Sequence, residues 1–285
     1  MPRSTGAAAD AAFNPVTRDC LTSGCLPVHT FVGGNAWVPT LLQDPAWRLN
    51  AASDRVFLQE TSLQAESMLR KAATLTVTLT LSDTAQLATV RVFNQTGHKL
   101  PSGYAEGRQM WLNLKAYDAD RQLIYESGLY SPTTGQLVRD ADIKVYEVKQ
   151  GLTPELAALL LKPAGESFHF MLNNTVVKDN RLPPRGYTQA LFNRPGLVPV
   201  GALYADGQYW DDTHYRLPLN TARLLVTLYY QTASKEYIDF LRQNGGVDGL
   251  SLSELWDGLK SPPEIVAQAW LPDYLRFLPA VLHNR

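Results

Sequence analysis

The chain has 285 residues, of which 45% are hydrophobic and 19% charged, and its formal net charge is −1. These proportions are typical of a globular protein that buries a large core, and the balanced charge excludes a basic surface of the kind that binds a nucleic-acid backbone. No run of 18 apolar residues is present, so we expect no transmembrane segment.

The first 52 residues predict an irregular N-terminal segment. Residues 1–18 are rich in alanine and lack the apolar centre of a signal peptide, so none is expected here. Cys20 and Cys25 are the two cysteines of the chain, and with His29 they form a Cys-x4-Cys-x3-His cluster. Structural zinc sites use four ligands, and no fourth lies near in sequence. A local Cys20–Cys25 disulfide, two free thiols and a metal pair are therefore all open.

A helix is predicted from Ser53, which caps it, to about Ala72, because apolar residues recur there at helical spacing. At Thr74 the apolar period changes from 3.6 to 2, which is typical of a strand with one buried face. We expect strands at 74–81, 87–93, 109–117, 122–127, 142–149, 166–172, 188–193 and 222–231. Many short strands separated by turn signals predict a mainly β fold, an antiparallel immunoglobulin- or fibronectin-like β-sandwich.

Further helices are expected after the capping or opening residues Thr153, Ser234, Ser251 or Ser253, and Pro262, the last of them running toward Trp270. The predicted organisation is an irregular segment over 1–52, a helix plus β-sandwich domain over 53–245, and a C-terminal helical extension over 246–285. Residues 203–218 hold three carboxylates, a histidine and four aromatic rings. A Ca²⁺ loop or a sugar platform is an alternative there, but the spacing of a Ca²⁺ loop is absent, and an aromatic-packed hairpin is expected.

The loop at 94–104 carries the most distinctive pattern, Asn-Gln-Thr-Gly-His-Lys-Leu-Pro-Ser-Gly-Tyr. It lies between the strands predicted at 87–93 and 109–117, which we expect in one sheet. Two glycines and a proline fix the path of the loop, so the imidazole of His98 is aimed in a defined direction. We expect His98 at the rim of the sandwich, within reach of solvent or a partner. The alternative is a buried His98 that braces the loop with both ring nitrogens bonded.

This pattern, followed by Arg108 and a strand led by Trp111, resembles a recurrent segment in the C-terminal, haem-free region of bacterial multihaem c-type cytochromes. Segments 29–35, 179–187 and 229–237 resemble the same region. The resemblance implies that His98 can be a distal axial ligand to a haem carried by a partner. It also implies that His29 is a further haem or metal ligand, whereas the alternative for His29 is a hydrogen-bonded loop histidine. Arg108 and Arg181 would face haem propionates, whereas surface salt bridges are the alternative for Arg181. Glu106 or a loop carbonyl would fix the imidazole tautomer.

Covalent attachment of a c-type haem requires Cys-x-x-Cys-His, and the spacing of Cys20 and Cys25, with Leu26 after the second, does not supply it. We expect no covalently bound haem. The resemblance implies an accessory domain of a periplasmic or extracellular electron-transfer assembly, whose partner is a multihaem c-type cytochrome or a related redox subunit. The alternative is a haem-independent binding or scaffolding sandwich. No nucleophile elbow, metalloprotease motif or nucleotide-binding loop is present, and we expect no enzymatic activity of the chain's own.

Overall fold

The computed structural model describes residues 3–9, 15–21, 26–27, 32–44, 52–82, 84–103, 107–194 and 196–271. The chain divides into two units, Met1–Gly33 and Gly34–Arg285. In the first unit, β1 (Arg3–Ser4) pairs with β4 (Leu26–Pro27), and β2 (Gly6–Ala9) pairs with β3 (Pro15–Arg18). Cys20 lies in this unit and is exposed, whereas Cys25 and His29 lie outside the described residues, so the disulfide and the His29 ligand stay predictions.

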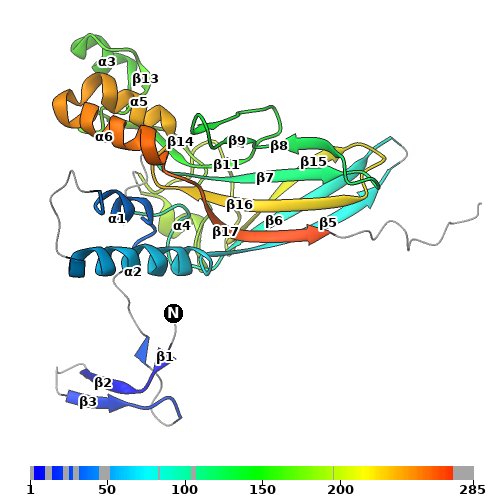
Figure 1. Cartoon of the computed structure of the whole chain (residues 1–285), viewed down its shortest axis with the longest axis horizontal. Coiled ribbons are helices and arrows are strands. Elements are labelled where there is room, and N and C mark those ends of the chain that lie inside the picture. The colour runs from blue at the N-terminus through cyan, green and yellow to red at the C-terminus, as the bar shows by residue number, and fades with distance from the viewer. Residues whose placement is uncertain are drawn as a thin grey trace, which may run out of the picture. The chain divides into compact units, whose positions relative to one another are not determined.

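Two antiparallel sheets form the body of the second unit (Figure 1). The first sheet has the order β11 (Val145–Tyr146), β7 (Gln109–Tyr117), β16 (Arg223–Gln231), β17 (Glu264–Leu271), and β8 (Leu123–Ser127) also pairs with β7. The second has the order β15 (Trp210–Leu217), β6 (Gln86–Asn94), β5 (Ala73–Leu81). The predicted mainly β, antiparallel sandwich is confirmed, and its immunoglobulin- or fibronectin-like type stays a prediction.

The core lies between these sheets, because alternate residues of each strand point inward. Ala88, Val90 and Val92 of β6 are at most 1% exposed, and alternate residues of β7 and β16, such as Leu114 and Val226, are fully buried. Burial of one such aliphatic side chain contributes on the order of 1.5–3 kcal/mol before the entropy cost is counted. The period-2 pattern in the sequence is therefore the pattern of the core.

The expectation that strands 87–93 and 109–117 share one sheet is wrong. β6 belongs to the sheet of β5 and β15, whereas β7 belongs to the sheet of β16. Residues 95–108 therefore cross from one sheet to the other. Alternation shows which face of a strand is buried but not which sheet the strand joins, and a connection of this length spans the roughly 10 Å between packed sheets.

Three further expectations are corrected. Residues 264–271 form strand β17 along β16 rather than a helix, because pairing with an available strand edge overrides a weak local preference. Residues 189–192 form the short helix α4 (Gln189–Phe192) instead of a strand, and the Thr188 side chain accepts the Leu191 N–H as its cap. In place of a strand over 166–172 the structure has only β13 (Gly165–Glu166).

Helices and a small sheet surround the sandwich. The helices are α1 (Trp37–Leu41), α2 (Ala52–Leu69), α3 (Pro154–Leu160), α5 (Lys235–Asn244) and α6 (Gly246–Leu259). The remaining strands are β12 (Val148–Leu152) and β14 (Thr175–Asp179), which pair with each other, and β9 (Tyr130–Ser131), which pairs with β10 (Gln136–Leu137). The capping roles predicted for Thr153 and Ser234 are confirmed. Among the described residues, no helix is long and apolar enough to cross a membrane.

Candidate functional site: the His98 loop

The loop that follows β6 is organised by the side chain of Asn94, which is fully buried. Its amide nitrogen shares its two protons among three backbone carbonyls, those of His98 at 2.7 Å, Leu182 at 3.0 Å and Pro183 at 2.9 Å. Its oxygen accepts the backbone N–H and the hydroxyl of Thr96, both at 2.8 Å. One side chain thus holds the loop closed and attaches it to the segment at 182–183.

His98 has a fixed backbone and an exposed side chain. Its N–H donates to the Thr96 hydroxyl at 3.2 Å, and its carbonyl accepts from Asn94. The Thr96 hydroxyl also lies 3.0 Å from that carbonyl and shares its one proton between it and the Asn94 oxygen. Within the described residues, the imidazole has no hydrogen-bond or ion-pair partner. Its pose is that of a histidine presented to solvent, as expected, and not that of one bracing the core. The proposed tautomer partner Glu106 lies outside the described residues.

The next residue, Lys99, points into the body instead. Its side chain is 7% exposed and its ammonium lies 2.8 Å from the Asp179 carboxylate, which is itself 1% exposed. Arg181 donates to the two oxygens of the same carboxylate through Nε and Nη2, both at 2.8 Å. Two cations thus share one buried anion. Leu100 and Leu182 complete the junction with reciprocal backbone hydrogen bonds of 2.9 Å.

The arginines expected to face a haem differ in their engagement. Arg108 is half-buried and donates from Nη1 to the Ser102 carbonyl at 2.8 Å, and its other N–H groups have no hydrogen-bond partner in the described chain. The guanidinium of Arg181 is engaged by both oxygens of Asp179. This geometry favours the alternative in which Arg181 forms a salt bridge, although the salt bridge is buried and not on the surface. Arg185 is exposed, donates to Gln95 at 2.7 Å and lies over the Tyr209 ring.

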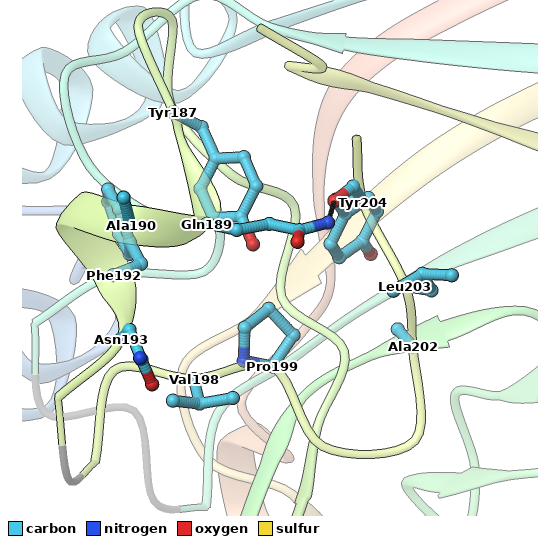
Figure 2. Close-up of a pocket in the computed structure, with 10 residues that line it drawn as sticks. All are labelled: Tyr187, Gln189, Ala190, Phe192, Asn193, Val198, Pro199, Ala202, Leu203 and Tyr204. Carbon is cyan, nitrogen blue, oxygen red and sulfur yellow. Dashed lines mark hydrogen bonds between the residues drawn. The ribbon is translucent and has the colours of Figure 1, made fainter. Parts of the chain in front are cut away.

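A pocket of about 370 Å³ lies beside the buried ion cluster (Figure 2). Tyr187, Phe192 and Tyr204 supply aromatic walls, with the Tyr187 and Phe192 rings 4.8 Å apart. Figure 2 shows the Gln189 side chain reaching toward Tyr204, whose carbonyl it contacts at 3.0 Å. The Lys99 ammonium lies 5.8 Å from the centre of the Phe192 ring, so this pocket adjoins the base of the His98 loop.

Gly34 and Gly107 each lie against a tyrosine of the segment at 229–237. A Cβ placed on Gly34, at the end of segment 29–35, would come within 3.5 Å of the Tyr230 hydroxyl. Gly107 has a positive φ of 75° and lies against the Tyr237 ring, and its carbonyl accepts the Ser234 N–H at 2.8 Å. A side chain at Gly107 would be strained and would clash with that ring. These two glycines let the backbone pack closely against the tyrosine rings.

A second buried carboxylate, Glu147, lies near the site. Its carboxylate forms salt bridges with Arg139 at 3.1 Å and with Lys178 at 2.8 Å. Its backbone N–H donates to the side-chain oxygen of Asn180 at 3.0 Å. Burial by itself raises the pKa of Glu147, but the hydrogen bonds and charges of Arg139 and Lys178 outweigh it and lower that pKa below its ordinary value. Burial opposes ionisation of Asp179 too, and Arg181 and Lys99 likewise lower its pKa.

We expect the protein to lose stability in acid through these two carboxylates. A pKa that is lower in the folded chain stabilises the fold above the unfolded values of 3.8 and 4.5, and this stabilisation disappears as the pH falls through the folded pKa values. The urea midpoint should therefore fall progressively as the pH drops below about 5. Glu147→Gln should be less stable at the higher pH and should lose less on acidification. An equal loss in both proteins would contradict the assignment.

Sequence reasoning located His98 but missed its supports. Asn94 belongs to the distinctive pattern at 94–104, but sequence reasoning assigned it no role. Its position at the end of a predicted strand could have indicated one, because an asparagine there can cap the following turn with its side chain. The roles of Lys99 and Asp179 had no local signal, because their contact joins residues 80 positions apart. Among the described residues, no group of three or more His, Cys, Asp or Glu side chains is placed to hold a metal ion.

Comparison with known proteins assigns no family. No family model matches the chain, and no curated protein matches it. A similar solved structure is the crystal structure of a penta-heme cytochrome c552 from Thermochromatium tepidum, with 17% identity and a TM-score of 0.46. The similarity covers 73% of this chain and 41% of that chain, so the present chain spans about two fifths of the cytochrome's length. A likeness at this level defines neither family nor function.

Proposed function

We propose that this chain is an accessory domain of an extracytoplasmic electron-transfer assembly and that it offers His98 as a distal axial ligand to a haem held by a partner. The partner is a multihaem c-type cytochrome or a related redox subunit, and the chain itself attaches no haem covalently. The observation that carries the proposal is the contrast within one residue. The backbone of His98 is held by hydrogen bonds with Asn94 and Thr96, whereas its imidazole is exposed and has no hydrogen-bond partner in the described chain.

Two features of the chain near His98 support a role as a haem ligand. A neutral imidazole supplies one nitrogen to iron, and a fixed backbone lowers the entropy lost when that bond forms. Arg108, on the same inter-sheet segment, retains N–H groups that suit an anionic propionate. A bound haem would supply the redox chemistry, and the chain's part would be to position a ligand and to cover the iron from water. The localisation outside the cytoplasm rests on the sequence resemblance.

The proposal is tested with a haem octapeptide (microperoxidase-8), a water-soluble c-type haem whose distal position is open. We expect the wild-type protein to convert its spectrum to the low-spin, bis-histidine form, and His98→Ala to abolish the conversion. His214→Ala is the matched control, because His214 is also exposed but its Nδ1 lies 3.0 Å from the Thr89 hydroxyl. That variant should behave as wild type.

A thermal melt of the same variants separates ligation from a structural role. The His98 ring is exposed and makes no hydrogen bond or ion pair within the described chain. His98→Ala should therefore change the free energy of unfolding by no more than about 0.5 kcal/mol. A large loss of stability without any spectral change would mean that His98 braces the loop, which favours the haem-independent scaffold. Conversion that persists in His98→Ala and disappears in His214→Ala would also refute the proposal.

A further inference from the structure

A larger groove of about 590 Å³ lies on the first sheet, lined by none of the residues placed above in the His98 site. Strands β7, β8, β16 and β17 form its floor, and the segments at 129–132 and 258–263 form its walls. Its lining comprises Asn113, Lys115, Glu126, Leu129, Tyr130, Pro132, Tyr229, Gly258, Leu259, Lys260, Pro262, Pro263 and Ile265. The volume falls in the range of roughly 300–1,000 Å³ that is typical of small-molecule sites.

Two tyrosine rings, both half-buried, line this groove. Tyr229 and Tyr130 pack on the fully buried Trp111, with ring centres 5.4 Å and 5.9 Å from it. The Trp111 N–H donates to the Gly128 carbonyl at 3.2 Å, which holds the support in place. The Tyr130 hydroxyl is also fixed, since it accepts from Gln231 and donates to the Lys260 carbonyl. The groove thus has a rigid aromatic wall before any ligand arrives.

Polar groups beside the rings have hydrogen-bonding capacity left over. Glu126 accepts Asn113 at 2.9 Å through Oε1 and lies 3.5 Å from the Lys115 ammonium. Three groups have no hydrogen-bond partner in the described chain. They are the Glu126 Oε2 atom, the Tyr229 hydroxyl and two of the three ammonium protons of Lys115. When a carboxylate oxygen and an ammonium lie side by side, the carboxylate can accept a hydrogen bond from one hydroxyl and the ammonium can donate one to the neighbouring hydroxyl. That arrangement matches the vicinal hydroxyls of a sugar.

Other ligand classes fit these observations less well. An extended peptide binds through backbone groups, and those of this sheet face are consumed by the strand ladder. A nucleotide or polyanion requires excess positive charge, whereas Lys115 is paired with Glu126 and Lys260 with Asp257, both at 3.5 Å. A lipid chain would leave the Glu126 carboxylate oxygen and the Tyr229 hydroxyl without hydrogen-bond partners. A sugar ring has an apolar C–H face for the tyrosines and hydroxyls for the polar groups.

We propose that this groove binds a neutral oligosaccharide, with Tyr229 as the stacking platform and Glu126 and Lys115 as the hydroxyl-binding pair. The test is calorimetric titration of the full chain with six probes. These are cellohexaose, maltohexaose, laminarihexaose, mannohexaose, xylohexaose and chitohexaose. We expect at least one probe to bind with a Kd below about 1 mM.

Two variants locate the site. Tyr229→Ala should weaken that binding by roughly tenfold or more through loss of the stacking surface. Glu126→Gln keeps an acceptor for Asn113 and the shape of the floor, and should weaken it comparably. Tyr209→Ala, in the aromatic stretch at 203–218, is the control and should leave the Kd unchanged. The proposal is overturned if no probe binds, if binding survives both groove variants while their circular dichroism stays native, or if only Tyr209→Ala removes it.

Discussion

Replacing Asp179 with asparagine should destabilise the protein by about 3–5 kcal/mol, the range measured when one partner of a buried ion pair is removed. The carboxylate is the common anion of Lys99 and Arg181, and the Lys99 ammonium has little access to water. An asparagine of the same shape offers one oxygen and turns N–H groups toward a cation. Lys99 would then remain buried without a full counter-charge.

Urea unfolding at neutral pH measures this loss. The matched control is Glu166→Gln, which breaks the ion pair of Lys149 and Glu166, with side chains 25% and 41% exposed. Exposed pairs contribute at most about 1 kcal/mol, so the control should be nearly as stable as wild type. Similar losses in the two variants would show that burial does not set the strength of the Asp179 cluster.

Asn94→Ala should lower the free energy of unfolding by about 2–4 kcal/mol, because the desolvation of buried polar groups is no longer offset once their hydrogen-bond partner is removed. The Pro183 carbonyl and the Thr96 N–H both lose the hydrogen bonds that Asn94 makes with them. We also expect the loop to lose its orientation, so that His98 converts the haem octapeptide less completely than in wild type.

The control for this variant is its neighbour Gln95→Ala. Gln95 is exposed, and within the described chain its side chain bonds only to Thr74 and Arg185. Its backbone N–H donates to the Ala72 carbonyl at 2.9 Å, a bond that an alanine at this position keeps. Its removal should change the free energy of unfolding by less than about 1 kcal/mol and leave the haem spectrum as in wild type. If Asn94→Ala were as stable as Gln95→Ala, the role of Asn94 as the organiser of the loop would be wrong.

Local patterns in the sequence predicted local structure well. Threonines alternating with leucines and valine predicted β5, and capping by Thr153 and Ser234 predicted the helices that follow them. These elements depend on periodicity and capping, which act over a few residues. The strand at 264–271 has no such local signal, because it forms by pairing with β16.

The candidate site divides in the same way. The glycines and proline of the loop predicted that His98 is presented on the surface, and the structure has it exposed. The sequence did not predict that Lys99, one position later, is buried, since lysine is rarely buried without a partner. That partner, Asp179, comes from a distant strand end, and only the folded chain brings the two together.

The order of strands in the first sheet has a consequence for how the chain folds. β16 pairs on one side with β7, far back in the sequence, and on the other with β17, whose last residue is Leu271. The sheet therefore cannot be completed before residues 264–271 have been synthesised, and its pairings are mostly non-local. Chains of this kind fold slowly and expose unpaired edges in the meantime. A nascent chain would thus leave the free edge of β16 exposed until β17 has been synthesised and paired with it.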